Sequence, residues 1–291
     1  MLEGFLVVDK APGMTSHDVV AVARKSLGTR KVGHAGTLDP MATGVLVLGF
    51  GNGTRLLQYI TDGDKSYTAT ISLGASTITD DHEGEAIKTV DASAVTDEDI
   101  RKYLGEMVGV IQQRPSSVSA VKVAGERAYD RVRAGEEFEL EARTVTISQL
   151  DIREIRHLEK SVEVDIDVTC SAGTFIRAIA RDLGNALGVG GHLRALRRTR
   201  VAGFGISKAI SFDALKAGEF IPLVLADVAR TTFAVRELAL DEVQELSFGR
   251  PLTECASSEL YAGLSPDNRL IALLKNLEGQ AKPIAVFAAA K

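Results

Sequence analysis

The chain has little of several residues and patterns that mark particular classes of protein. Its 291 residues contain no Trp, seven Pro, 5% aromatic residues and only two Cys. Cys170 and Cys255 are far apart and form no CxxC pair, so neither a disulfide framework nor a zinc site is expected. The sequence has no apolar run of the ~18 residues that a membrane span needs, and its first residues lack the features of a signal peptide. We therefore expect a cytoplasmic protein with reduced thiols and no membrane association.

The residues that are abundant indicate an ordinary globular protein. Hydrophobic residues make up 45% of the chain and charged residues 25%. The 27 Gly favour a turn-rich, mixed or β-rich fold over a helical bundle. The net charge of -5 argues against a surface coated in basic residues for nucleic acid. It allows a local basic face, because the electric field depends on where the charges lie.

Hydrophobic periodicity predicts the order of the main elements. Alternating patterns predict strands at residues 4–9, 44–50, 65–73, 144–155 and 161–170, the last two as a hairpin. Capping signals predict a helix after Ser16, a helix at 96–108 with Thr96 as its N-cap, and a helix at 174–187. Residues 74–84 read as a polar loop and residues 221–229 as an apolar connector. After residue 230 the chain changes to short β-like runs between Gly and Pro turns, which predicts domains at 1–229 and 230–291.

Asp39 is the strongest candidate for chemistry. It lies in a polar, glycine-rich loop directly before a buried strand, and Pro40 disfavours helical geometry at Asp39. A carboxylate there can be a nucleophile, a base or a metal ligand. It can equally be a turn aspartate that bonds its own backbone, which is common in Asp-Pro sequences. His34 lies five residues earlier, and the absence of an HxH or HxxxH pair predicts no metal site.

Three further features could belong to a site. Arg177 lies at the expected start of a helix, where the dipole disfavours a cation, so it either pairs with a carboxylate or phosphate or packs its stem on the surface. Four arginines at 194–200 indicate either an RNA or DNA backbone as partner or a solvated face paired with acids. Tyr67, in a strand pattern, is either a core aromatic or a stacking platform for an unstacked base. The turn at 49–54 lacks the third glycine of a dinucleotide fingerprint, so no nucleotide cofactor is predicted.

Five short motifs occur together between about residues 5 and 200. The central one is Gly33-His-Ala-Gly-Thr-Leu-Asp-Pro40 followed by Ala42-Thr-Gly-Val-Leu, and the others are Asp9-Lys-Ala-Pro-Gly-Met-Thr-Ser16, Lys65-Ser-Tyr67, Ser171-Ala-Gly-Thr-Phe-Ile-Arg177 and Leu196-Arg-Arg198. In order and spacing they resemble the motifs of the TruB family of tRNA pseudouridine synthases. Two positions depart from the family pattern: Ala11 precedes Pro12 where Pro usually follows Lys, and Phe175 stands where Tyr is common.

The resemblance implies an activity and a set of residue roles. The activity is isomerisation of uridine 55 in the TΨC loop of tRNA to pseudouridine, without a metal or an organic cofactor. Asp39 would attack the uridine, at C1′ of the ribose or at C6 of the base. Arg177 would pair with Asp39, and Tyr67 would stack on the target base and help to move a proton. The remaining substrate-binding residues would be His34, Phe175 and Leu196, the first holding the loop RNA and the other two lining the uracil pocket.

The resemblance also implies a fold and a set of partners. The fold would be α/β (α+β): a catalytic domain with a mixed, largely antiparallel sheet, an inserted RNA-clamping segment at about 112–143, and a small β-rich, PUA-like domain at the C-terminus. The partner would be tRNA, with no guide RNA, no obligate protein partner and a monomeric enzyme. Two alternatives stay open: an RNA-folding protein that has lost its chemistry, and a guide-RNA-dependent synthase of the archaeal and eukaryotic type. The intact Asp39, Tyr67 and Arg177 argue against the first, and a start close to the first motif without basic tails argues against the second.

Overall fold

A large mixed sheet forms the framework of the protein. The computed structural model describes residues 2–116, 122–123, 126–127, 140–257 and 259–288. The strands of the large sheet are β1 (Gly4–Lys10), β2 (Val32–His34), β3 (Thr43–Phe50), β4 (Lys65–Leu73), β7 (Gly109–Gln113), β10 (Arg143–His157), β11 (Val162–Cys170), β12 (Gly191–Val201), β13 (Phe204–Gly205) and β14 (Ile210–Ser211). Their order is β14-β1-β3-β12-β4-β11-β10-β7, with β2 beside β3 and β13 beside β12.

Most neighbouring strands run antiparallel, and two pairs are parallel: β1 with β14, and β3 with β12. This confirms the predicted mixed, largely antiparallel sheet and the hairpin of β10 and β11. In β4 every second side chain, from Lys65 to Leu73, is buried, and the Ser and Thr residues between them are partly exposed. This period of two is that of a strand with one face on a core.

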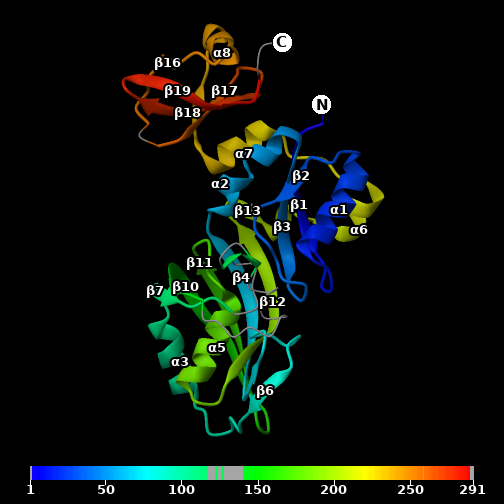
Figure 1. Ribbon diagram of the computed structural model, residues 1–291, viewed down its shortest axis with the longest axis vertical. Helices are drawn as coiled ribbons and strands as arrows, with labels where there is room; N and C mark the ends of the chain where they lie inside the picture. Colours follow the sequence, from blue (N-terminus) through cyan, green and yellow to red (C-terminus); the bar gives the residue numbers. More distant parts are fainter. Residues whose placement is uncertain (1, 117–121, 124–125, 128–139, 258, 289–291) are drawn as a thin grey trace.

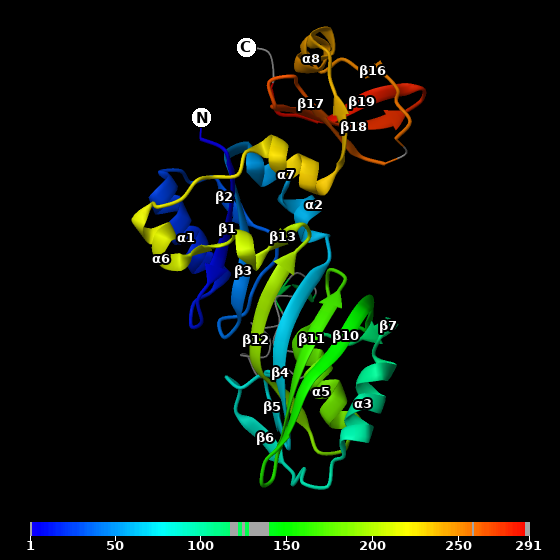
Figure 2. The same ribbon diagram turned by 180° about the vertical axis from the view of Figure 1, so that it is seen from behind.

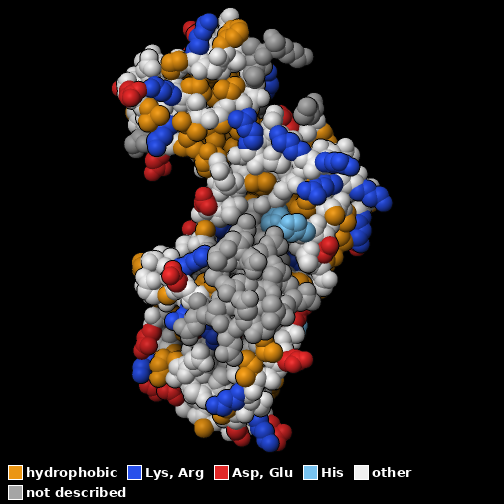
Figure 3. Space-filling model, in the orientation of Figure 1, with side chains coloured by type: hydrophobic (Ala, Val, Ile, Leu, Met, Phe, Trp, Pro, Cys, Tyr) orange, Lys and Arg blue, Asp and Glu red, His pale blue; other side chains and the backbone are white. Residues whose placement is uncertain are grey.

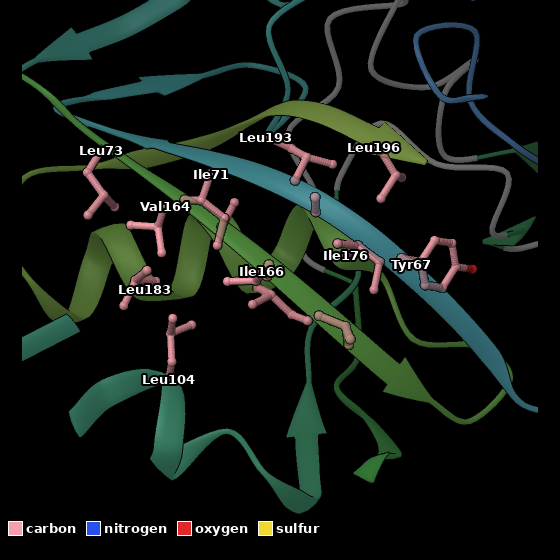
Figure 4. Packing of buried hydrophobic residues seen from close by; sticks show 14 of the residues in the cluster. Tyr67, Ile71, Leu73, Leu104, Val164, Ile166, Ile176, Leu183, Leu193 and Leu196 are labelled. Atoms are coloured by element: carbon pink, nitrogen blue, oxygen red, sulfur yellow. The ribbon is translucent and has the colours of Figure 1, made fainter. Parts of the chain in front are cut away.

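Helices cover one face of the β10–β12 half of the sheet. They are α3 (Asp97–Glu106) and α5 (Ile176–Ala186), and the opposite face of β12, β4, β11 and β10 carries no helix in the second view (Figures 1 and 2). A cluster of buried side chains fills the space between this half of the sheet and the two helices. Tyr67 lies at one end of this cluster, with its hydroxyl directed away from the packed side chains (Figure 4).

Shorter elements complete the large sheet's surroundings. They are α1 (Ser16–Leu27), η1 (Gly51–Arg55), α2 (Leu57–Thr61), β5 (Ala75–Thr77), β6 (Ala86–Thr89), η2 (Ile206–Lys208) and α6 (Phe212–Ala217). A two-stranded pair, β8 (Lys122–Val123) and β9 (Glu126–Arg127), lies within the predicted insertion, and the rest of that prediction falls largely outside the described residues.

Two of the predicted local features are wrong, and one is confirmed. Thr15, not Ser16, is the N-cap of α1: its side chain accepts a hydrogen bond from the N–H of Asp18, and the Asp18 carboxylate accepts one from the N–H of Thr15. The loop predicted at 74–84 contains β5. Thr96 caps α3 as predicted, by accepting from the N–H of Asp99.

A second, smaller sheet lies at one end of the elongated molecule (Figures 1 and 2). Its elements are β15 (Ala234–Glu237), α8 (Leu240–Ser247), β16 (Leu252–Thr253), β17 (Tyr261–Leu264), β18 (Leu270–Leu277) and β19 (Gln280–Val286). Helix α7 (Leu225–Thr232) leads into it and replaces the predicted connector. Buried residues of both sheets, including Phe5, Val45 and Leu264, belong to one hydrophobic cluster. The β-rich C-terminal part is confirmed, whereas the boundary at 229/230, which falls inside α7, stays a prediction.

No helix among the described residues has the length and apolar character required to cross a membrane.

Gly44 marks the closest approach of two strands in the large sheet. Its φ is +99°, and a Cβ atom there would lie 2.1 Å from the carbonyl oxygen of Arg198 on β12. We expect Gly44→Ala to lower the free energy of unfolding by roughly 2 kcal/mol or more, because it combines backbone strain with a clash against backbone. Urea denaturation measures this change.

Gly105→Ala is the matched control for that measurement. Gly105 lies in the last turn of α3, where an added Cβ meets nothing within 4 Å. Alanine is the better helix former, so this variant should gain up to about 1 kcal/mol. Equal effects of the two substitutions would contradict the account of the β3–β12 contact.

Candidate active site

Asp39 lies in a tight turn whose backbone is held by buried side chains. Its carbonyl oxygen accepts a hydrogen bond from the N–H of Ala42 at 3.1 Å, and Pro40 occupies the second position of this turn. The buried Ser16 hydroxyl accepts from the N–H of Leu38 at 2.8 Å and donates to the Leu38 carbonyl at 3.1 Å. The turn uses the backbone of Asp39 and leaves its carboxylate available for other contacts.

Lys10 supports the same turn from β1. Its fully buried ammonium donates to the carbonyls of Ala11, Met14 and Pro40, at 3.0, 2.7 and 3.2 Å. Burial lowers the pKa of Lys10 to about 8. A pKa of that value still leaves the ammonium charged at neutral pH. Lys10 therefore ties the loop that follows β1 to the turn that carries Asp39.

Arg177 is the partner of the Asp39 carboxylate. Its Nε lies 3.0 Å from Asp39 Oδ2, and its side chain is 6% exposed, against 37% for Asp39. Arg177 is the second residue of α5, where the helix dipole disfavours a positive charge. Contacts with carboxylates compensate for that position and for the burial of the guanidinium.

A second carboxylate completes the surroundings of Arg177. Asp81 Oδ2 lies 3.3 Å from Arg177 Nη1, which also donates to the carbonyl of Thr79 at 2.7 Å. Asp81 is 4% exposed, and its other oxygen accepts from the Thr79 hydroxyl and from the N–H of Glu83. Sequence reasoning missed Asp81, because it stands in a stretch read as a polar loop. The only local signal is the pair of adjacent acids at 80 and 81.

Five of the six predicted site residues line one cavity of about 500 Å³. They are Asp39, Tyr67, Phe175, Arg177 and Leu196. The cavity combines a half-exposed carboxylate and buried cations with aromatic and aliphatic walls. It can therefore hold a flat, partly polar ring next to a carboxylate.

Tyr67 contributes a protonated phenol to this cavity. Burial raises its pKa above 10.0, and the nearby Arg198 guanidinium opposes that shift only in part. At neutral pH the hydroxyl keeps its proton and can serve as a hydrogen-bond donor. Its ring is buried among apolar residues, as for a core aromatic, and it also lines the cavity, as a stacking platform would.

His34, the sixth predicted residue, lies outside the lining of this cavity. It is on β2, and its ring contacts that of His17 on α1 edge to face, with centroids 5.5 Å apart. Burial first, and His17 second, lower the pKa of His34 below 6.5. His34 is therefore neutral at pH 7. Among the residues that the structure describes, no group of three or more His, Cys, Asp or Glu could hold a metal ion.

The arginine cluster at 194–200 contacts other parts of the chain. Arg198 is buried and donates to the carbonyls of Val45 and Gly36, at 2.8 and 3.0 Å. Arg194 pairs with Glu163, and Arg197 pairs with Asp9. The alternative of pairing with acids thus holds for two of these residues, and the RNA-binding interpretation of the cluster stays a prediction.

Exposed cations gather elsewhere on the surface. On the face shown in Figure 3, Lys and Arg side chains lie over the region of α1 and β2, next to the histidines. The exposed basic residues of this part are Arg24, Lys25, Arg30 and Lys31. We call these four residues the α1 basic surface. It gives a chain of net charge -5 a local positive face.

Solved structures share this fold. The chain aligns with a structure described as a Cbf5-Nop10-Gar1 complex at 26% identity and a TM-score of 0.71, over 99% of this chain and 84% of that one. It also aligns with one described as an H/ACA RNP bound to a substrate RNA containing 2'-deoxyuridine, at 24% identity and a TM-score of 0.72, over 98% and 84%. The large mixed sheet is thus the fold of pseudouridine synthases.

Family models and close relatives give the family. The model of the N-terminal domain of TruB family pseudouridylate synthases matches residues 24–176, and C-terminal models of the same synthases match residues 177–221 and 233–288. The tRNA pseudouridine synthase B of Arthrobacter sp. (strain FB24) is 52% identical, over 99% of this chain and 97% of that protein. That of Thermobifida fusca (strain YX) is 48% identical, over 99% of both. The chain belongs to the TruB family of pseudouridylate synthases.

The neutral, buried His34 should make stability depend on pH. An unfolded chain protonates this imidazole near pH 6.5, whereas the folded protein does so only at lower pH. Between these two values the unfolded state binds more protons, so stability is lost as pH falls through 6.5. We expect the wild type to lose more stability than His34→Gln between about pH 7.5 and pH 5.5, measured by urea denaturation at each pH. Parallel pH profiles for the two proteins would refute this.

Proposed function

We propose that this protein is a tRNA pseudouridine synthase that converts uridine 55 of the TΨC loop to pseudouridine. The contact between Asp39 and Arg177 inside the cavity with Tyr67 carries the proposal. It supplies a carboxylate with a fixed counter-charge in a cavity large enough for a nucleobase. The proposed roles are Asp39 as nucleophile, Arg177 as its partner, and Tyr67, Phe175 and Leu196 as the walls around the base.

The target nucleotide has to leave the RNA stack to reach this cavity. Flipping a base costs a few kcal/mol, and stacking on aromatic faces recovers part of this cost. Tyr67 and Phe175 offer such faces within the cavity. His34 lies outside it, which suits a role with the loop RNA rather than with the flipped base. The α1 basic surface offers charges for the RNA backbone.

The isomerisation breaks one bond to the ribose and forms another. The N1–C1′ bond of uridine breaks, a C5–C1′ bond forms, C5 loses a proton and N1 gains one. Asp39 forms a transient bond during this exchange, to C1′ or to C6, and is released at the end. The detached uracil has to stay in place while it turns, and the apolar residues in the cavity wall serve that purpose.

Arg177 and Asp81 prepare Asp39 for this attack. The guanidinium stabilises the negative charge of Asp39, and its contacts with Thr79 and Asp81 fix its direction. A nucleophile held in one orientation avoids part of the entropic cost of reaction. Tyr67, as a protonated phenol, can donate a hydrogen bond to the base or relay a proton.

The same proposal covers the partners and the arrangement of the chain. The enzyme acts on tRNA alone in the cytoplasm, as a monomer without guide RNA or protein partners. Residues 1–229 form the catalytic domain, residues 112–143 clamp the RNA, and residues 230–291 form a small PUA-like RNA-binding domain. The 97% and 99% coverage of the relatives called tRNA pseudouridine synthase B supports this reading over the guide-dependent one.

Loss of the Asp39 carboxylate should abolish turnover. We expect Asp39→Asn to reduce pseudouridine formation in an isolated TΨC stem-loop by at least about 10³-fold, because an amide is a poor nucleophile. Affinity for the RNA should change little. Mapping of pseudouridine after incubation without other proteins, together with a filter-binding titration, measures both quantities.

Asp213→Asn, at an exposed site on α6, is the control and should behave as wild type. Turnover by Asp39→Asn at the wild-type rate would refute the mechanism. A wild-type protein that needs added partner proteins would support the guide-dependent alternative instead.

Removal of the Asp81 charge should slow catalysis without affecting RNA binding. Asp81→Asn keeps the shape of the side chain but removes the charge of one carboxylate that Arg177 contacts. We expect kcat to fall roughly 10- to 100-fold with little change in KM, since a misplaced nucleophile costs rate rather than binding. Single-turnover kinetics with the stem-loop measure this effect, and a change confined to KM would contradict it.

A further inference from the structure

Gln113 makes an unusual pair of contacts at the end of β7. Its side chain is 3% exposed and reaches across to the chain segment before α5. There its Oε1 accepts a hydrogen bond from the backbone N–H of Phe175 at 2.8 Å, and its Nε2 donates to the Phe175 carbonyl at 3.1 Å. One amide thus satisfies both backbone groups of one residue, as a neighbouring strand would do.

The two hydrogen bonds from the Gln113 side chain, which we call the Gln113 clamp, determine the position of Phe175. It is the N-cap residue of α5, with extended backbone angles, and its side chain makes no capping hydrogen bond. It follows an irregular turn in which Gly173 has a φ of +84° and nothing within 4 Å of a Cβ position. Such a turn does not by itself fix the residue that follows it. The hydrogen bonds of Gln113 supply that constraint.

The segment that carries Gln113 is itself fixed against α5. Arg181 donates to the carbonyl of Arg114 at 2.7 Å and also pairs with Asp80 at 3.2 Å. Gln113 is also paired in register with Arg143 on the neighbouring strand β10, and Arg143 lines the cavity. The clamp therefore joins two well-anchored elements, and a movement of either one would be transmitted to Phe175.

The geometry points to Gln113 as a positioning residue that holds Phe175 against the base in the cavity. This inference rests on the proposed function, because Phe175 matters for turnover only if a nucleobase enters. The uracil has to be held in the cavity while it turns, so a wall that shifts allows unproductive orientations. RNA affinity depends mainly on contacts outside the cavity. Loss of the clamp should consequently lower kcat and leave KM almost unchanged.

The test compares two glutamines. Gln113→Met keeps the volume of the side chain and removes both hydrogen bonds. Gln149→Met is the matched control, because Gln149 is exposed on the neighbouring strand β10, outside the segment proposed to clamp the RNA, and its amide donates to the Asp151 carboxylate. We expect kcat on the stem-loop to fall at least about tenfold for Gln113→Met, as for a misplaced wall, and to stay near wild type for the control.

A fluorescent reporter separates the clamp from the activity. The chain contains no Trp, so Phe175→Trp introduces a single fluorophore at the cavity wall. In this background Gln113→Met should lower the fluorescence anisotropy of the RNA-free protein, and Gln149→Met should leave it unchanged. If the wild type made no pseudouridine, the proposed function would fail. The anisotropy of the RNA-free protein would still show whether Gln113 holds residue 175 in place.

Gln113→Glu keeps the test decisive if Gln113→Met does not fold. The carboxylate can still accept from the N–H of Phe175 but cannot donate to its carbonyl. If Gln113→Met folds, the kcat of Gln113→Glu should lie between that of Gln113→Met and that of wild type. If it does not fold, the kcat of Gln113→Glu should still lie below that of wild type. Equal kcat values for the Gln113 and Gln149 variants would overturn the inference. So would a loss of activity that appears only in KM, or an unchanged anisotropy in Gln113→Met.

Discussion

The buried guanidinium of Arg177 is the constraint on which the active site depends. A cation that is 6% exposed, at the start of a helix, is stable only if negative charge is brought to it. Asp39 and Asp81 bring that charge from two loops far apart in sequence, the turn before β3 and the stretch before β6. Breaking a buried pair such as Arg177–Asp81 costs about 3–5 kcal/mol. Fold stability and the placement of the carboxylate are therefore linked.

The turn that carries Asp39 is held almost entirely through its carbonyl groups. Arg198 binds the carbonyls of Gly36 and Thr37, Ser16 binds that of Leu38, and Lys10 binds that of Pro40. These three donors belong to the first and last of the sequence motifs and, apart from Arg198, do not line the cavity. The motifs at residues 9–16 and 196–198 therefore support the turn in the motif that contains Asp39. A half-exposed nucleophile thus lies on a backbone that cannot easily move.

Much of the fold, and part of the site, could be predicted from the sequence. Strict alternation identified β4 to the residue, because one of its faces is buried and the other is not. The cap at Ser16 was wrong because adjacent hydroxyl residues compete, and the position of Asp18 selects Thr15. Asp81 was missed, and the pairing of the arginine cluster was left open, for one reason: sequence gives the number of charges but not which of them meet. Only the folded chain brings Arg197 to Asp9 and Arg177 to Asp81.

The exposure of Asp39 has a chemical consequence for the proposed reaction. At 37% exposure the carboxylate is hydrated in the free protein, and water lowers its reactivity. A base that enters the cavity would displace this water, while the guanidinium of Arg177 stays in contact and keeps the negative charge stabilised. The nucleophile would then become reactive only when its substrate is present. Walls that hold the base, Tyr67 and the clamped Phe175 among them, would contribute to reactivity by excluding water as well as by orientation.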